Sequence, residues 1–116
     1  MAEIESLLPL QNATFYILTA LGEGELHGYR IILDVAARTG GAVKLSAGTL
    51  YRSIQRMLEQ GLIVETRERP SPEEDDERRR YYQITPLGSA VVRAELRRLQ
   101  QLIKLARAKG FAPEKA

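Results

Sequence analysis

The sequence predicts a mainly α fold with a small two-stranded antiparallel wing and a long C-terminal helix. Three observations lead to this prediction. Residues 45–62 combine a helix-capping serine, apolar residues at helical spacing and a terminal glycine. Two short runs with strand-like alternation, 62–67 and 80–85, flank a charged loop that contains two prolines. Apolar residues at heptad spacing then continue from residue 92 to residue 106.

The composition indicates a single globular domain with a modest core. The chain has 116 residues, of which 44% are hydrophobic and 28% are charged. It contains no cysteine, which excludes disulfides and thiolate metal sites. No apolar run is long enough to span a membrane, and the acidic N-terminus does not resemble a signal peptide. We therefore expect a cytoplasmic protein with no membrane association, no metal and no cofactor.

The net charge is only +2, but the charges are segregated along the chain. Acidic residues provide all the charge in residues 1–26, and residues 73–77 are wholly acidic. Residues 78–80 are all arginine, and basic residues predominate in residues 86–110. Such segregation can create a positive surface on a nearly neutral protein, as a polyanion partner requires.

Two helices are predicted before residue 45. Residues 9–21 carry a broad apolar stripe, which suggests burial on more than one side, and Gly22 ends this helix. Residues 27–39 form the second helix, which the glycines at 40 and 41 end. Its expected core residues are Tyr29, Ile32, Leu33, Val35 and Ala36.

The third helix has two unlike faces. Ser46 is suited to cap its start, and Gly61 is suited to the left-handed position after its end. One face is apolar and consists of Leu50, Ile54, Met57 and Leu58. The other face carries Thr49, Arg52, Gln55 and Arg56. These polar residue types suit reading base edges and binding phosphates, although an ordinary amphipathic surface helix is the alternative.

A hairpin and a last helix complete the expected fold. Tyr82, in register with Ile84, is the expected core residue of the second strand, and Tyr81 the exposed one. Three helices followed by a hairpin describe a winged helix-turn-helix. Thr85 and Pro86 are suited to start the last helix. Its heptad seam consists of Val92, Leu96, Leu99, Ile103 and Ala106.

We favour pairing of this seam with a second copy of the chain over packing on its own domain. The domain organisation expected from these elements has three parts. A winged helix-turn-helix DNA-binding domain occupies residues 1–85, a dimerisation helix residues 86–110, and a tail residues 111–116.

Three blocks of the sequence resemble the PadR-type transcriptional regulators. The blocks are LHGYRI at residues 26–31, the third helix at residues 45–62, and RRYYQITPLG at residues 79–88. They occur in the order of that family. The resemblance implies a homodimeric bacterial or archaeal DNA-binding regulator, most often a repressor. The third helix would enter the major groove, the wing would lie along the backbone or minor groove, and the single last helix, as in the short branch of the family, would mediate dimerisation.

The expected DNA-binding residues lie on the third helix, in the stem of the wing and at the start of the second helix. They are Ser46, Thr49, Tyr51, Arg52, Gln55, Arg56, Arg79, Arg80 and His27. Gln55 is suited to hydrogen bond with adenine, and Arg52 is suited to hydrogen bond with guanine. Arg79 and Arg80 are suited to contact phosphates. Two of these residues keep an alternative role. Tyr51 could pack against the wing instead of contacting DNA. His27 could make a structural hydrogen bond instead of a phosphate contact.

The chain departs from the family pattern at three places. Ala47 and Arg52 stand where the family often has proline. The wing tip is acidic at residues 73–77, where the family often has a short basic tip. Because phosphate repels acidic side chains, the stem at residues 78–80 is the better candidate for contact with DNA.

The expected function is that of a sequence-specific transcriptional regulator, a repressor that binds an inverted repeat as a homodimer. Its expected partners are double-stranded DNA and a second copy, with an unidentified small-molecule effector left open. A dimeric protein-interaction module without specific DNA binding is the alternative. An enzyme is disfavoured, because one histidine without cysteine leaves no recognisable catalytic set.

Overall fold

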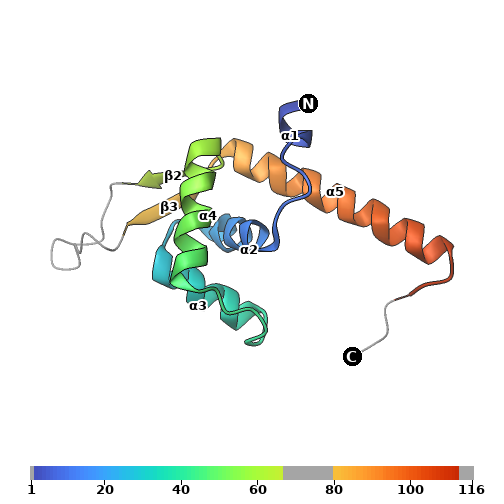
Figure 1. Ribbon diagram of the computed structural model, residues 1–116, viewed down its shortest axis with the longest axis horizontal. Helices are drawn as coiled ribbons and strands as arrows, with labels where there is room; N and C mark the ends of the chain where they lie inside the picture. Colours follow the sequence, from blue (N-terminus) through green and yellow to red (C-terminus); the bar gives the residue numbers. More distant parts are fainter. Residues whose placement is uncertain (1, 67–79, 113–116) are drawn as a thin grey trace.

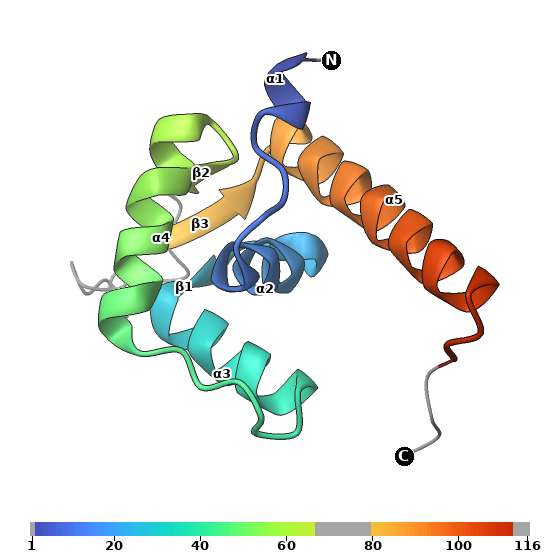
Figure 2. The ribbon, with the colours of Figure 1, turned by 45° about the vertical axis from the view of Figure 1, so that its right-hand side comes forward.

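The computed structural model describes residues 2–66 and 80–112 of the chain. It confirms a mainly helical fold with a small antiparallel sheet and a long last helix (Figure 1). The elements in chain order are α1 (Ala2–Glu5), α2 (Asn12–Ala20), the 3-10 helix η1 (Leu21–Glu23), β1 (Leu26–His27), α3 (Gly28–Arg38), α4 (Ala47–Gln60), β2 (Ile63–Thr66), β3 (Tyr81–Ile84) and α5 (Pro86–Ala108). Helices α2, α3 and α4 group beside the sheet, and α5 extends away from them (Figure 2).

The sheet contains the two predicted strands of the wing and a third, very short strand. Its order is β1-β3-β2, and both pairings are antiparallel. In the wing, Ile63 pairs with Ile84 and Glu65 pairs with Tyr82. Strand β1 was not predicted, because two residues are too few to show an alternating pattern. Through it the chain before α3 is tied to the middle of the sheet.

The predicted helix caps of α4 and α5 are confirmed. The Ser46 hydroxyl accepts the Thr49 N–H at 3.1 Å, and Gly61 adopts the left-handed conformation with φ 76°. The Thr85 hydroxyl accepts the Gly88 N–H at 3.0 Å and donates to the Gly61 carbonyl at 2.7 Å. Thr85 therefore connects the end of α4 directly to the start of α5.

The predicted helix over residues 9–21 starts later than expected. Helix α2 begins at Asn12, and the short helix α1 precedes it. The reason is a tertiary contact, because the Leu10 N–H donates to the Glu95 carboxylate at 2.9 Å and is not used in a helix. The end also differs, since the chain continues as η1 from Leu21 to Glu23.

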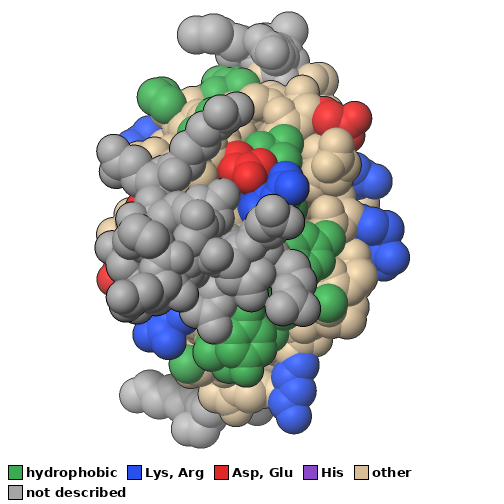
Figure 3. Space-filling view, turned by 90° about the vertical axis from the view of Figure 1, so that its left-hand side faces the viewer, with side chains coloured by type: hydrophobic (Ala, Val, Ile, Leu, Met, Phe, Trp, Pro, Cys, Tyr) green, Lys and Arg blue, Asp and Glu red, His purple; other side chains and the backbone are tan. Residues whose placement is uncertain are grey.

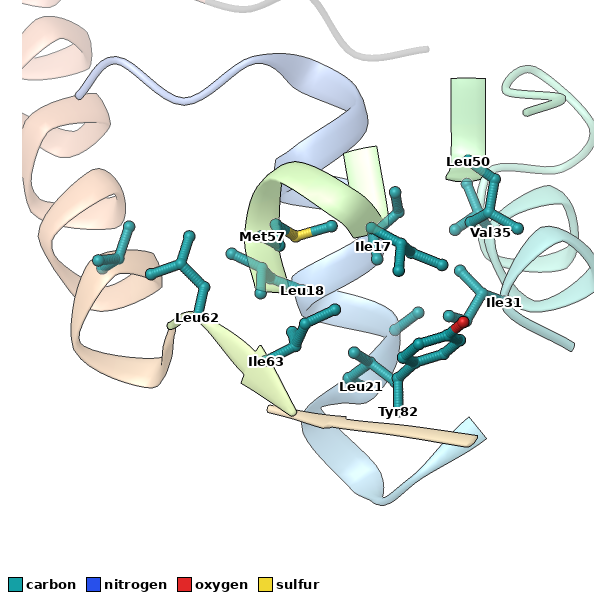
Figure 4. Packing of buried hydrophobic residues seen from close by; sticks show 13 residues of the cluster. Ile17, Leu18, Leu21, Ile31, Val35, Leu50, Met57, Leu62, Ile63 and Tyr82 are labelled. Atoms are coloured by element: carbon teal, nitrogen blue, oxygen red, sulfur yellow. The ribbon is translucent and has the colours of Figure 1, made fainter. Parts of the chain in front are cut away.

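The core lies between α2, α3, α4, the sheet and the first turns of α5 (Figure 4). Its buried hydrophobic residues are Ile17, Leu18, Ala20, Leu21, Ile31, Val35, Leu50, Ile54, Met57, Leu62, Ile63, Tyr82 and Val91. The prediction of Tyr82 as a core residue is confirmed. Tyr81 is half-buried rather than exposed, because its ring meets that of His27.

The predicted core of α3 needs a correction. Tyr29 is 63% exposed and Leu33 is 41% exposed, whereas Ile31 is fully buried. The helix begins at Gly28, which is buried close to the Tyr51 side chain of α4. This contact turns Ile31 inward beside Val35, which is buried as predicted, so the inner face is centred on these two residues and excludes Tyr29 and Leu33.

Helix α5 belongs to the core over its first half only. Val91 is fully buried, and Glu95 is 3% exposed although it carries a carboxylate. That carboxylate accepts the Leu10 N–H and hydrogen bonds from Arg98 at 2.5 and 3.1 Å. Every described residue from 100 onward is exposed. The first half of α5 thus holds the N-terminal segment, and the second half projects into solvent.

Replacement of Gly88 by alanine is expected to destabilise the protein. A Cβ atom at Gly88 would collide with the Leu62 carbonyl oxygen and the Ile84 side chain, and the backbone oxygen cannot rotate away. We expect Gly88→Ala to lower the free energy of unfolding by about 2 kcal/mol or more, measured by urea denaturation. The matched control is Gly22→Ala, whose Cβ meets no atom within 4 Å and which should stay within about 0.5 kcal/mol of the wild type.

Glu95 is expected to make stability fall in acid. The hydrogen-bonded Arg98 guanidinium lowers the pKa of Glu95, with help from the Leu10 amide and against the effect of burial. A carboxyl group with a lowered pKa in the folded protein stabilises it above about pH 4.5, and this contribution is lost as the pH falls through the lowered value.

We therefore expect Glu95→Gln to be less stable than the wild type at pH 7 by about 1.5–3 kcal/mol, because a charged hydrogen-bond acceptor is lost. The difference should shrink steadily below about pH 4.5. Thermal unfolding measured from pH 7 to pH 2.5 checks this. Glu25→Gln, at an exposed position, is the control, and a constant difference between Glu95→Gln and the wild type would contradict the assignment.

Candidate nucleic-acid interface

Helix α4 separates its apolar and polar residues as predicted. Leu50, Ile54 and Met57 are buried in the core. The side turned to solvent carries the exposed side chains of Tyr51, Arg52, Gln55 and Arg56, and Glu59 and Gln60 are exposed in the last turn of the helix. Thr49 is half-buried beside them. Within the described residues neither Arg52 nor Arg56 forms an ion pair, so both guanidinium groups are available to an anion.

The start of α4 is rigidly capped. The Ser46 hydroxyl accepts the Thr49 N–H and also donates to the Thr49 hydroxyl, with 3.1 Å between the two oxygens. The Ser46 and Thr49 hydroxyl groups are therefore hydrogen-bonded to each other in the free protein. This arrangement fixes the first turn of α4, from which Arg52 projects one turn later.

The wing flank of α4, formed by Tyr51, Gln55 and Leu58, faces β2 and β3 across a hollow of about 550 Å³. Glu65, Arg80 and Tyr82 line its other side. The structure thus brings together three of the predicted DNA-binding residues, Tyr51, Gln55 and Arg80. Figure 3 views the molecule from the wing side and shows basic side chains at several places around this face.

An acidic residue that the sequence did not single out lies in this hollow. Glu65 Oε2 is 3.5 Å from Arg80 Nη1, so the carboxylate holds the arginine against the sheet. Burial raises the pKa of Tyr82, and the charge of Glu65 adds to this effect. The ion pair between Glu65 and Arg80 depends on the register of β2 and β3. This register cannot be derived from the sequence, because a long loop separates the two strands.

His27 performs the structural role that was left open for it. Its Nδ1 accepts the Arg30 N–H at 3.1 Å and so caps α3. Its ring meets Tyr81 edge-on, with centroids 5.5 Å apart and an interplanar angle of 84°. A phosphate contact by His27 stays a prediction. The predicted contact of Arg79 and the acidic run at residues 73–77 lie outside the described residues.

The predicted dimerisation seam is divided between two environments. Val92 is half-buried and packs against the core, and Leu99 is half-buried. Leu96 is 45% exposed, Ile103 is 51% exposed and Ala106 is exposed as well. Leu102 and Leu105, which widen the seam, are also exposed. The projecting half of α5 therefore carries an apolar surface that the described part of its own chain does not cover.

Other kinds of site find little support in the described part of the chain. Among its residues no group of three or more histidine, aspartate or glutamate side chains is placed to hold a metal ion. None of its helices is both long and apolar enough to cross a membrane.

The order of the elements and the exposed polar face of α4 define a winged helix-turn-helix protein. The model of the PadR-like family of transcriptional regulators matches residues 17–94. This segment runs from α2 to the first turns of α5 and makes up more than half of the chain. The protein therefore belongs to the PadR-like family of transcriptional regulators.

Solved structures share this fold. A transcriptional regulator from Clostridium thermocellum is 24% identical, with a TM-score of 0.71 over 85% of this chain and 90% of that chain. A PadR family regulator from Clostridium difficile is 23% identical, with a TM-score of 0.68 over 84% and 97% of the two chains. Bacillus subtilis PadR in complex with operator DNA is 20% identical, with a TM-score of 0.63 over 76% and 48%. Among proteins of curated function none matches this sequence.

Proposed function

We propose that this PadR-family regulator binds a specific DNA sequence as a homodimer and represses transcription from an inverted-repeat operator. The observation that carries the proposal is the exposed face of α4, on which Arg52, Gln55 and Arg56 stand opposite the buried Leu50, Ile54 and Met57. The fold shared with Bacillus subtilis PadR, whose structure contains operator DNA, supports it.

In the proposed complex α4 lies in the major groove, which is about 12 Å wide and admits a helix. Gln55 would pair with adenine and Arg52 with guanine, because their side chains match the donors and acceptors of those bases. Arg80 on the wing side and Arg56 on the other side would bind phosphates. The hydroxyl groups of Thr49 and Tyr51 would add neutral phosphate contacts.

Dimerisation is proposed to occur through the projecting half of α5. Exposed leucine and isoleucine side chains at heptad spacing gain free energy when a second copy covers them. Two-fold symmetry would place the two α4 helices on half-sites about one helical turn apart, and the operator would then be an inverted repeat. A dimer bound in this way would repress by blocking access of the polymerase. Regulation by a small-molecule effector, which stays open, would require the effector to change the spacing or rigidity of the two wings.

The first test is binding of the full-length protein to the DNA upstream of its own gene, against scrambled DNA, at two salt concentrations. We expect selective binding to the upstream DNA, with Arg52→Ala and Gln55→Ala each about 5- to 100-fold weaker because a base contact is lost. Gln55→Ala should also relax the preference at one base pair. Arg97→Ala, on the exposed surface of α5, is the control and should bind like the wild type.

Equal, weak binding to both DNAs that salt abolishes, with no effect of either α4 variant, would contradict specific recognition by α4. It would favour the alternative of a dimeric protein-interaction module. A pull-down of partners would then follow.

Disruption of the seam is expected to separate the dimer. Ile103→Glu places a charge in the centre of the proposed interface, at a position that is half-exposed in the single chain and does not support its core. We expect this variant to sediment as a monomer at concentrations where the wild type is a dimer, with unchanged helical content. Gln101→Glu adds the same charge outside the seam and should leave the dimer intact. A wild type that is monomeric at all concentrations would disprove dimerisation through α5.

A further inference from the structure

The first turn of α2 presents three backbone donors without acceptors. Gln11 precedes the helix in an extended conformation (φ −65°, ψ 147°), and its side chain makes no capping hydrogen bond. The first helical bond runs from the Phe15 N–H to the Gln11 carbonyl at 3.0 Å. The N–H groups of Asn12, Ala13 and Thr14 therefore have no helical acceptor, and none bonds to any described residue.

The side chain of Thr14, a largely buried residue, lies beside these three donors. Thr14 is only 8% exposed, and its side chain forms no hydrogen bond with the described part of the chain. It lines two adjoining hollows of about 170 and 200 Å³. The first lies between the start of α2 and α4, and the second lies between the segment that precedes α2 and α4. The hydroxyl therefore has no partner from the described residues at the wall of these hollows, where it can donate a hydrogen bond to a ligand that accepts one.

The surroundings of the two hollows are electropositive. Arg56 of α4 lines both hollows, and Arg52 lines the first. None of the described residues that line either hollow is acidic. The positive end of the α2 dipole points into the same space, so the helix and the two guanidinium groups favour the same ligand charge.

The segment that enters α2 is held in place independently of any ligand. The Leu10 N–H donates to the Glu95 carboxylate at 2.9 Å, and Arg98 compensates the charge of that carboxylate. The three free N–H groups follow directly after this anchor. An anion would therefore meet donors that are already oriented, and little ordering entropy would be lost on binding.

We propose that the start of α2, the Thr14 hydroxyl and the Arg56 guanidinium together form an oxyanion site that takes a phosphate group of the DNA backbone. The proposal rests on the proposed function and adds to it a second site of contact with the DNA backbone. Thr49, Ser53 and Arg56 form the α2 flank of α4, opposite the wing flank. A helix in the major groove lies between two rows of phosphates, so the α2 site and Arg80 would contact opposite strands.

The test uses the ¹⁵N-labelled full-length protein, a duplex of random sequence at low salt and, separately, inorganic phosphate. A random duplex suffices because a phosphate contact does not depend on base sequence. We expect the duplex to shift the amide signals of Asn12, Ala13 and Thr14. Thr14→Val keeps the buried volume, removes the hydroxyl, and should bind the duplex about five- to tenfold more weakly.

Arg56→Gln should weaken duplex binding and reduce the slope of log affinity against log salt by about one. This variant is at an exposed position, so it carries the test even if Thr14→Val fails to fold, which circular dichroism reports. Thr19→Val is the matched control on the same helix. Its exposed hydroxyl donates to the Phe15 carbonyl at 2.7 Å, and its loss should leave binding unchanged.

Three other outcomes separate the site from the proposed function. Duplex binding without shifts at residues 12–14 and without loss in either variant would overturn the site and leave DNA binding intact. If inorganic phosphate shifts these signals, the duplex does not, and Thr14→Val abolishes the shifts, the oxyanion site would be supported. The DNA backbone would then be overturned as the source of its phosphate. Shifts with neither ligand would overturn the site altogether.

Discussion

The buried Glu95 carboxylate is the contact on which the relative placement of the main parts depends. It lies on α5, accepts the Leu10 N–H and is held by Arg98. One side chain thus joins the helix proposed for dimerisation to the segment that leads into α2. A buried charge with incomplete hydrogen bonding is costly, whereas this one has both a cation and a backbone donor. The arrangement favours one position of α5 over others that would leave the carboxylate unpaired.

The hollow on the wing flank of α4 differs in character from the two hollows on its α2 flank, which suggests a division of roles. On the wing flank Glu65 holds Arg80, so the cation there must exchange a carboxylate for a phosphate. On the α2 flank Arg52 and Arg56 have no ion-pair partner among the described residues. Affinity from the second flank needs no such exchange. A protein with a net charge of only +2 can therefore concentrate its attraction for phosphate on a small surface.

The sequence predicted those parts whose signals are local. Ser46, Gly61 and Thr85 mark helix ends through their own chemistry, and the apolar spacing of α4 identifies its buried face. The parts that it did not predict depend on contacts between distant residues. Leu10 is withdrawn from the predicted helix by Glu95, and the inner face of α3 is turned by the approach of Gly28 to α4. Thr14 carries no local signal, because only the fold shows that its side chain lines the hollows beside α4 without a partner among the described residues.

The continuity of α5 sets a geometric relation between its two ends. Its 23 residues at about 1.5 Å per residue give a rod of roughly 34 Å, with the first turns fixed in the core and the rest free of it. No hinge residue separates the two halves. A rotation of the fixed end by a few degrees would displace the far end by some ångströms, as with any stiff lever. In the proposed dimer, a small substitution near Gly88 or Val91 would thus alter the separation of the two α4 helices without contacting either of them.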